Sequence, residues 1–238
     1  LLYFDVTRGD VPVNSVDVSF EAAKGIGYIK VSKFARNTYN EFITAIAKLK
    51  QAGCTSFVID LRGNTGGYMD AAINMINEFM PEGRLIVYTE GKSFPRSDVY
   101  ANGTGTCKDA PIVVLTDEIS ASASEIFSGA IQDNDRGTII GRRTYGKGLV
   151  QTQMSLSDGS EMRLTIARYY TPSGRCIQKK YEMGNTDAYD QDIYNRYMHG
   201  EFDSADSIKM DDSLKYQTVG GRTVYGGGGI MPDIFIPR

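Results

Sequence analysis

A serine at the start of an expected helix is the first residue of this sequence that could carry chemistry. Ser122 lies between an apolar strand-like run at 111–116 and a helix expected from Ser122 to Gln132. A helix N-terminus presents free backbone N–H groups and the positive end of the helix dipole, and both stabilise a developing oxyanion. However, Ser122-x-x-Glu125 is also an ordinary capping box. This segment alone therefore favours a structural role over a nucleophile.

A lysine between two glycines is the second candidate. The segment Gly141–Lys147 nearly reproduces the phosphate-binding loop G-x-x-x-x-G-K-[ST], but Gly148 stands where Ser or Thr is needed. Such a loop should also open a helix, whereas residues 149–154 alternate like a strand. Nucleotide binding is therefore the weaker hypothesis. On a strand, Lys147 and Gln151 would share one face, and the glycines would let Lys147 approach another element closely, so both side chains are expected to point into one cleft.

A glycine-rich loop is the third candidate. It runs Arg62-Gly63-Asn64-Thr65-Gly66-Gly67 and follows a short apolar strand expected at 56–61. Backbone N–H groups in such a loop can form an anion-binding nest. A tight turn with glycines at positive φ explains the same residues and is favoured when the loop is taken alone.

A serine nucleophile needs a base. His199 is the only histidine of the chain and lies in a polar stretch, which argues against a Ser-His-Asp triad. A lysine serves as a base when its amine is neutral, and burial favours that form, as does a neutral neighbour such as Gln151. Ser122, Lys147 and Gln151 are therefore a candidate set, although spacing alone leaves the base undecided.

The composition excludes several classes of protein. The chain has 238 residues, of which 41% are hydrophobic and 23% charged, as in an ordinary globular protein. A net charge of −3 produces no positive electrostatic field that would attract nucleic acid or an anionic bilayer. No apolar run reaches the roughly 18 residues of a membrane span. Cys54, Cys107 and Cys176 form neither a disulfide framework nor a spaced metal site.

Strands and helices alternate through the middle of the chain, which predicts an α/β fold with strands buried on both faces. Thr38-x-x-Glu41 is interpreted as a capping box that opens a helix, and Gly53 as its end. Residues 149–156 and 162–170 are expected to form a hairpin. From about 179 to 215 the composition shifts to Asp, Tyr and Asn, which indicates a surface insertion. Tyr189, Ile193 and Tyr197 fall at helical spacing there.

Several motifs in one order resemble the C-terminal processing peptidases, also called tail-specific proteases. The resemblance covers about residues 5–238, apart from the insertion. It rests on these segments: Asp60-Leu61-Arg62-x-Asn64-x-Gly66-Gly67; Ser120-Ala-Ser-Ala-Ser-Glu125-Ile126-Phe127; Ala130–Asp133; Thr144-Tyr145-Gly146-Lys147-Gly148 with Val150-Gln151; Tyr170–Gln178; and Gly227-Gly228-Gly229-Ile230-x-Pro232-Asp233. Thr7-Arg8-Gly9 looks like the end of the family's PDZ domain.

The resemblance implies a serine endopeptidase with a Ser-Lys dyad. Ser122 would be the nucleophile, Lys147 the general base, and Gln151 would orient Lys147. The backbone N–H groups of Gly67 and Ala123 would form the oxyanion hole, and no metal or organic cofactor is implied. The implied fold resembles the crotonase/ClpP type, a spiral of ββα units with additional β-hairpins.

The same resemblance implies a wider setting. Residues 1–23 would be the end of a PDZ domain with linker strands, and 24–238 the protease core. Substrates would be unfolded or tail-tagged proteins cleaved near the C-terminus, bound as an added strand. The family suggests a cell-envelope location, mostly the bacterial periplasm, and a homo-oligomer stays open. The PDZ domain of the same polypeptide would be a partner, and nucleic acid would not. The alternative functions are a peptide-binding module on the same fold, inactive in this truncated form, and crotonase-like acyl-CoA chemistry.

Overall fold

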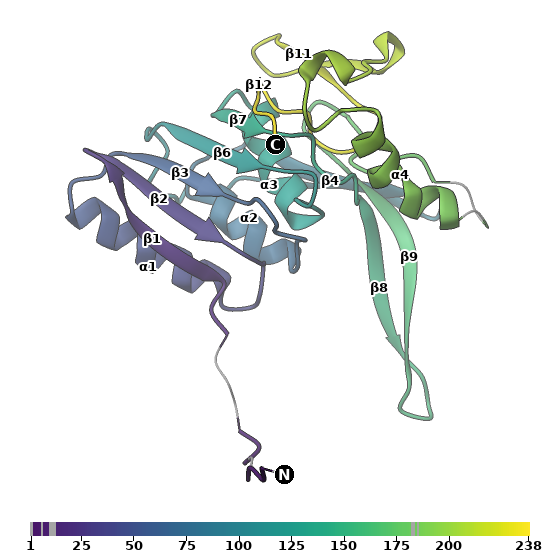
Figure 1. Cartoon of the computed structure of the whole chain (residues 1–238), viewed down its shortest axis with the longest axis horizontal. Coiled ribbons are helices and arrows are strands. Elements are labelled where there is room, and N and C mark those ends of the chain that lie inside the picture. Colours follow the sequence, from purple (N-terminus) through teal and green to yellow (C-terminus); the bar gives the residue numbers. More distant parts are fainter. Residues whose placement is uncertain (1, 6, 10–12, 182–183, 185) are drawn as a thin grey trace.

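A six-stranded sheet forms the centre of the computed structural model, which describes residues 2–5, 7–9, 13–181, 184 and 186–238 (Figure 1). Its strand order is β1-β2-β3-β6-β7-β12, with β1 and β2 antiparallel and the remaining neighbours parallel. The strands are β1 (Val16–Ala23), β2 (Ile26–Val31), β3 (Ser56–Asp60), β6 (Ile112–Thr116), β7 (Thr138–Gly141) and β12 (Ile234–Phe235). β3 and β6 lie side by side, so the loops that follow them meet at one sheet edge.

Three helices cover one face of this sheet (Figure 1). They are α1 (Thr38–Gln51), α2 (Met69–Asn77) and α3 (Ala123–Asp133). Four phenylalanines connect these helices to the sheet, because the Phe79 ring lies 6.2 Å from Phe42, 6.4 Å from Phe57 and 6.5 Å from Phe127 between centroids. α3 is buried at every position from Ala123 to Asp133, so the start of this helix is held firmly in place.

A second, antiparallel sheet has the order β5-β4-β9-β8. Its strands are β4 (Leu85–Gly91), β5 (Phe94–Tyr100), β8 (Leu149–Ser155) and β9 (Glu161–Tyr170). β8 and β9 form the hairpin expected from the sequence, and it projects from the body of the molecule (Figure 1). β8 is an edge strand of this sheet.

The remaining elements lie in the C-terminal part of the chain. They are α4 (Thr186–Met198), 3₁₀ turns at Ala205–Ser207 and Asp212–Leu214, and the strand pair β10 (Lys215–Gln217) and β11 (Thr223–Tyr225). α4 confirms the helix expected from the spacing of Tyr189, Ile193 and Tyr197. Tyr189 and Ile193 are half-buried, whereas Tyr197 is exposed, so the packed face of α4 does not include Tyr197.

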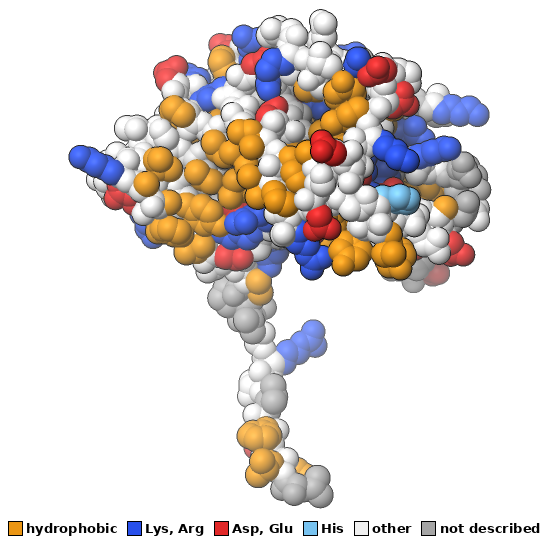
Figure 2. Space-filling model, turned by 45° about the horizontal axis from the view of Figure 1, so that its top comes forward, with side chains coloured by type: hydrophobic (Ala, Val, Ile, Leu, Met, Phe, Trp, Pro, Cys, Tyr) orange, Lys and Arg blue, Asp and Glu red, His pale blue; other side chains and the backbone are white. Residues whose placement is uncertain are grey.

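The mixed α/β class is confirmed, but burial of the strands on both faces was wrong. β6 alternates between fully buried and half-buried residues, and most of β3 follows the same pattern, because α1–α3 cover only one face. On the face drawn in Figure 2, hydrophobic side chains gather in the region of this sheet. The spiral of ββα units stays a prediction. So does the division into 1–23 and 24–238, although β1 pairs with β2 inside the main sheet.

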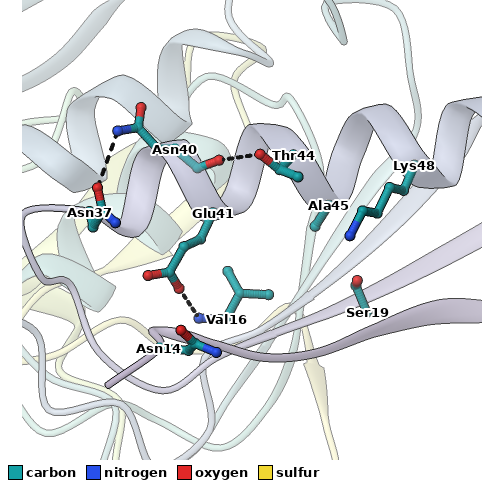
Figure 3. A pocket seen from close by; sticks show the side chains of 9 residues that line it. All are labelled: Asn14, Val16, Ser19, Asn37, Asn40, Glu41, Thr44, Ala45 and Lys48. Carbon is teal, nitrogen blue, oxygen red and sulfur yellow. Dashed lines mark hydrogen bonds between the residues drawn. The ribbon is translucent and has the colours of Figure 1, made fainter. Parts of the chain in front are cut away.

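The capping box expected at Thr38 and Glu41 was also wrong. Asn37 is the N-cap of α1, and the Glu41 carboxylate accepts from the backbone N–H groups of Ser15 at 2.7 Å and Val16 at 3.0 Å. Glu41 thus fastens β1 to α1, at a pocket that opens between these two elements (Figure 3). The expected end of the helix at Gly53 is confirmed, because Ala52 is the C-cap and Gly53 has φ +94°.

Candidate active site

Ser122 lies on a strained turn between β6 and α3. Its backbone has φ 57° and ψ −111°, and Asp135 is the one other non-glycine residue with positive φ in the described part of the chain. The preceding turn is held by Ser120, whose hydroxyl donates to the Leu61 carbonyl at 2.8 Å. Such a conformation costs on the order of 1–3 kcal/mol and persists only where the surroundings impose it.

The glycine loop packs directly against Ser122. A Cβ on Gly66 would lie 2.7 Å from the Ser122 Cβ and 3.0 Å from the Ala123 nitrogen. Asn64, which is fully buried, fastens the loop: its carbonyl accepts from the Ala121 N–H at 2.9 Å and from the Ser124 hydroxyl at 2.9 Å. Its side chain bonds to Val31 and to the Gly66 N–H. The loop and the start of α3 therefore form one rigid unit.

Two backbone N–H groups beside Ser122 are free to bind an oxyanion. The Gly66 carbonyl accepts from Phe34 N at 2.9 Å, and a trans peptide turns the Gly67 N–H to the opposite side. Ala123 is the first residue of α3, so its N–H has no partner within the helix. Among the described residues neither N–H has a hydrogen-bond acceptor. The oxyanion hole that the resemblance implies at these two N–H groups stays a prediction.

Glu125 joins the serine segment to the lysine loop. Its carboxylate is fully buried and accepts from Ser122 N at 2.8 Å, Gly146 N at 2.7 Å, Lys147 N at 2.8 Å and the Thr144 hydroxyl at 2.5 Å. Burial raises the pKa of the Glu125 carboxyl, and these four hydrogen bonds act against that rise. The sequence indicated only a helix cap here, because a local motif does not show that residues 144–147 return to the same carboxylate.

The side chain of Lys147 lies differently from the prediction. It is exposed rather than turned inward, and among the described residues no hydrogen bond joins its amine to Ser122. It lines a pocket with Thr65 and Ala121, which precede Gly66 and Ser122 in sequence. Lys147 thus lines a pocket near the start of α3, but no hydrogen bond between its amine and the Ser122 hydroxyl is present among the described residues.

Gln151 does not share that pocket. It is exposed near the start of β8 and lines a second pocket with Gly67, Tyr68 and Phe34. The shared face was expected from strand alternation, but β8 begins only at Leu149, and its pairing with β9 shifts register between Val150 and Gln151. Lys147 and Gln151 therefore line two different pockets, both of which include a residue of the glycine loop.

The competing sites receive no support from the structure. The N–H groups of Gly146 and Lys147, which would cradle a phosphate, are already bound to Glu125, and a strand rather than a helix follows. His199 is exposed, with its Nδ1 2.6 Å from the Asn195 carbonyl oxygen. Within the described residues there is no group of three His, Cys, Asp or Glu side chains that could hold a metal ion.

No helix among the described residues is both long and apolar enough to cross a membrane.

A serine on a strained turn at a helix N-terminus, with two free N–H groups beside it, is the arrangement found in serine hydrolases. The sequence matches the model of Peptidase family S41 over residues 25–187. The chain belongs to this peptidase family, which confirms the resemblance seen in its motifs.

Relatives and solved structures agree with this membership. The chain is 38% identical over 179 residues to a carboxyl-terminal-processing protease of Synechocystis, a match covering 74% of this chain and 42% of that protein. It is 38% identical over 159 residues to the chloroplastic C-terminal processing peptidase of Tetradesmus obliquus, covering 66% and 34%. The solved photosystem II D1 C-terminal processing protease superposes with a TM-score of 0.68 at 28% identity, covering 97% of this chain and 50% of that one. The chain thus spans less than half the length of these curated relatives.

Proposed function

We propose that this chain carries the catalytic site of a serine endopeptidase that cleaves unfolded or tail-tagged polypeptides near their C-termini. The observation that carries the proposal is the strained Ser122, flanked by the free N–H groups of Gly67 and Ala123. The Ser122 hydroxyl attacks the scissile carbonyl carbon, and its proton passes to the neutral amine of Lys147. The two N–H groups bind the oxyanion. Collapse gives an acyl ester on Ser122, releases the amine product with that proton, and water then hydrolyses the ester.

The mechanism requires that Lys147 be covered when substrate is bound. Its side chain is exposed in the structure, whereas a lysine that acts in covalent catalysis works in a site from which water is excluded. An extended substrate can add to the free edge of β8, because β8 is an edge strand and Gln151 near its start lines a pocket with Gly67. A chain bound there leads toward Ser122, covers the lysine loop and contacts Gln151, which we propose orients Lys147.

The test is cleavage of a reduced, unfolded polypeptide by the protein and its variants, with products identified by mass spectrometry. We expect Ser122→Ala and Lys147→Ala each to lower kcat/KM by about 10³-fold or more, because each removes a group that acts in the chemical step. Lys24→Ala, at an exposed lysine between β1 and β2, is the matched control and should cleave as the parent does. Unchanged cleavage in Ser122→Ala would overturn the proposal.

A peptide-binding module is the second candidate, and the exposed Lys147 amine is the observation that favours it. It predicts that an unfolded polypeptide binds with equal affinity to the parent and to Ser122→Ala, without products. The cell-envelope location and the PDZ domain of the same polypeptide are also proposals. Both rest on the family resemblance alone.

A further inference from the structure

A pocket of about 330 Å³ is lined by Ala121 and Thr65, and the residues that directly follow these two in sequence are Ser122 and Gly66. Lys147 lines this pocket as well, whereas Gln151 lines a different one. The other lining side chains are Ile119, Tyr145 and Tyr189. The lining is mostly aliphatic and aromatic, so the pocket favours an apolar group over a charged one.

One wall of this pocket comes from α4. Tyr189 lies in the first turns of α4, and the family model ends at residue 187, so this wall lies beyond the matched region. The Tyr189 ring meets Tyr145 edge to face, with centroids 6.3 Å apart and planes at 70°. The Tyr181 ring also meets the Tyr189 ring edge to face, with centroids 5.8 Å apart. Three aromatic rings thus fix the position of this wall.

Lys179 holds Tyr189 against Tyr145. The Lys179 side chain is only 6% exposed, and its amine donates to the Tyr189 carbonyl at 2.9 Å and pairs with Asp192 at 3.3 Å. The same amine lies 4.2 Å from the Tyr145 ring centroid and 4.1 Å from that of Tyr189. A cation between two aromatic faces stabilises their arrangement, more so where water is excluded.

A buried arginine fastens α4 to the lysine loop itself. Arg196 donates to the backbone carbonyls of Thr144 at 3.0 Å and Arg143 at 2.7 Å, and pairs with Glu201 at 2.9 Å. Glu201 in turn binds the Arg143 guanidinium. Burial lowers the pKa of Arg196, as expected where a cation is removed from water. α4 is therefore built onto the segment that precedes Lys147, and is not a loosely attached decoration.

We propose that α4 is the specificity-determining wall of this site: Tyr189, with Tyr145 and Ile119, bounds a pocket that receives an apolar side chain of the substrate next to the scissile bond. This inference rests on the proposed function. A side chain seated there also packs against Lys147, which lines the same pocket, and excludes water from it. An apolar residue in the pocket should therefore raise kcat as well as lower KM.

The test is a peptide series in which the residues flanking the scissile bond are, in turn, Ala, Leu, Phe, Trp or Asp. Each peptide is assayed with the full protein and with the variants Tyr189→Ala, Tyr189→Trp and Tyr194→Ala. At one of these positions we expect Tyr189→Ala to raise the Phe-to-Ala ratio of kcat/KM by about 10-fold or more, and Tyr189→Trp to lower it, because the pocket becomes larger or smaller. Tyr194, 60% exposed on the same helix, is the control and should leave every ratio unchanged.

The Phe-to-Ala ratio of kcat/KM distinguishes a role of Tyr189 in specificity from a role in supporting the fold. Damage to the fold would lower the cleavage of all peptides by the same factor and leave the ratio unchanged. Tyr189→Leu keeps an apolar contact with Tyr145 and serves as the test if the alanine variant does not fold. Cleavage that persists in the Tyr189 variants with unchanged ratios would overturn the role of α4 and leave the protease proposal standing. No Ser122-dependent cleavage of any peptide would overturn both.

Discussion

The backbone of Ser122 has a conformation that a helix cap does not need. N-cap residues ordinarily have extended φ and ψ angles, whereas Ser122 has φ 57° and ψ −111°. The Glu125 carboxylate accepts a hydrogen bond from the Ser122 N–H, so the two residues do cap the helix. Capping alone, however, does not explain the strained backbone of Ser122. A strained residue that presents its side chain beside free N–H groups is typical of a nucleophile.

At Glu125 the structure predicts a large effect of a small change. Glu125→Gln replaces one acceptor oxygen by an NH₂ group. That group faces either the Ser122 and Lys147 N–H donors, which bind Oε2, or the Gly146 N–H and the Thr144 hydroxyl, which bind Oε1. We expect cleavage to fall by about 10²-fold, because the two loops lose their common anchor. We also expect the free energy of unfolding to fall by about 1–3 kcal/mol.

The measurement is kcat/KM on an unfolded polypeptide, together with urea unfolding. Glu82→Gln, at an exposed glutamate, is the matched control and should change neither quantity. A Glu125→Gln variant with normal activity would show that the two loops keep their positions without this carboxylate.

At the scale of elements, the sequence motifs predicted the segments that form the site, but they did not predict the tertiary contacts that hold these segments together. The strand before the glycine loop, α3 and the β8–β9 hairpin were all expected. The structure adds a reason for two further motifs of the family resemblance. Gln178 accepts from the Gly148 N–H at 2.9 Å, and Ile230 N donates to the Thr144 hydroxyl at 2.6 Å, so both motifs pack around the lysine loop.

The errors at Glu41 and Lys147 share one cause, which is a contact between residues distant in sequence. Glu41 matched a local capping pattern, but it binds N–H groups 25 and 26 residues earlier. Lys147 was placed by strand periodicity, but it lies in a loop held by Glu125, 22 residues before it. The contribution of Tyr189 from α4 had no sequence signal beyond helical spacing. Local patterns do not carry such tertiary contacts.

The glycine loop gives a prediction with an internal control. Gly66→Ala combines a strained φ of +98° with a Cβ 2.7 Å from the Ser122 Cβ, so it should displace Ser122 and lower kcat/KM by about 10²-fold or more. Gly63→Ala has a strained φ of +72° but meets nothing within 4 Å. It should lower stability and keep activity.

Both glycine variants are compared by thermal unfolding and by cleavage of one peptide substrate. Equal loss of activity in the two would mean that backbone strain, and not the close approach of Gly66 to Ser122, explains the effect.

At the scale of the whole molecule, an ionic cluster fixes the sheet edge from which the site extends. Asp60, 1% exposed, accepts from the Tyr28 hydroxyl at 2.5 Å and the Arg62 guanidinium at 2.7 Å, and pairs with Lys30 at 3.4 Å. Burial raises the pKa of the Asp60 carboxyl, but the hydrogen bonds from Arg62 and Tyr28 outweigh burial, so its pKa lies below its usual value.

This lowered pKa predicts a pH dependence of stability. A carboxyl whose pKa is lower in the folded state stabilises the fold above its ordinary pKa of about 4, and that contribution is lost as the pH falls through the folded value. Asp60→Asn should therefore lower the free energy of unfolding by about 1–3 kcal/mol at pH 7. The difference from the parent should shrink below about pH 4.

Urea unfolding at a series of pH values measures this difference. Asp203→Asn, at an exposed carboxylate, is the control for the loss of one negative charge. A difference between Asp60→Asn and the parent that stays constant from pH 7 to pH 3 would contradict the account.

The central claim is that Ser122 becomes acylated during turnover, and trapping that intermediate tests it most directly. The protein is mixed with an activated peptide ester, quenched in acid within milliseconds, and analysed by intact and peptide mass spectrometry. We predict one added acyl group on Ser122 in the parent and none in Ser122→Ala. Hydrolysis of the ester by Ser122→Ala at the parent's rate, or an acyl group on a different residue, would contradict the claim.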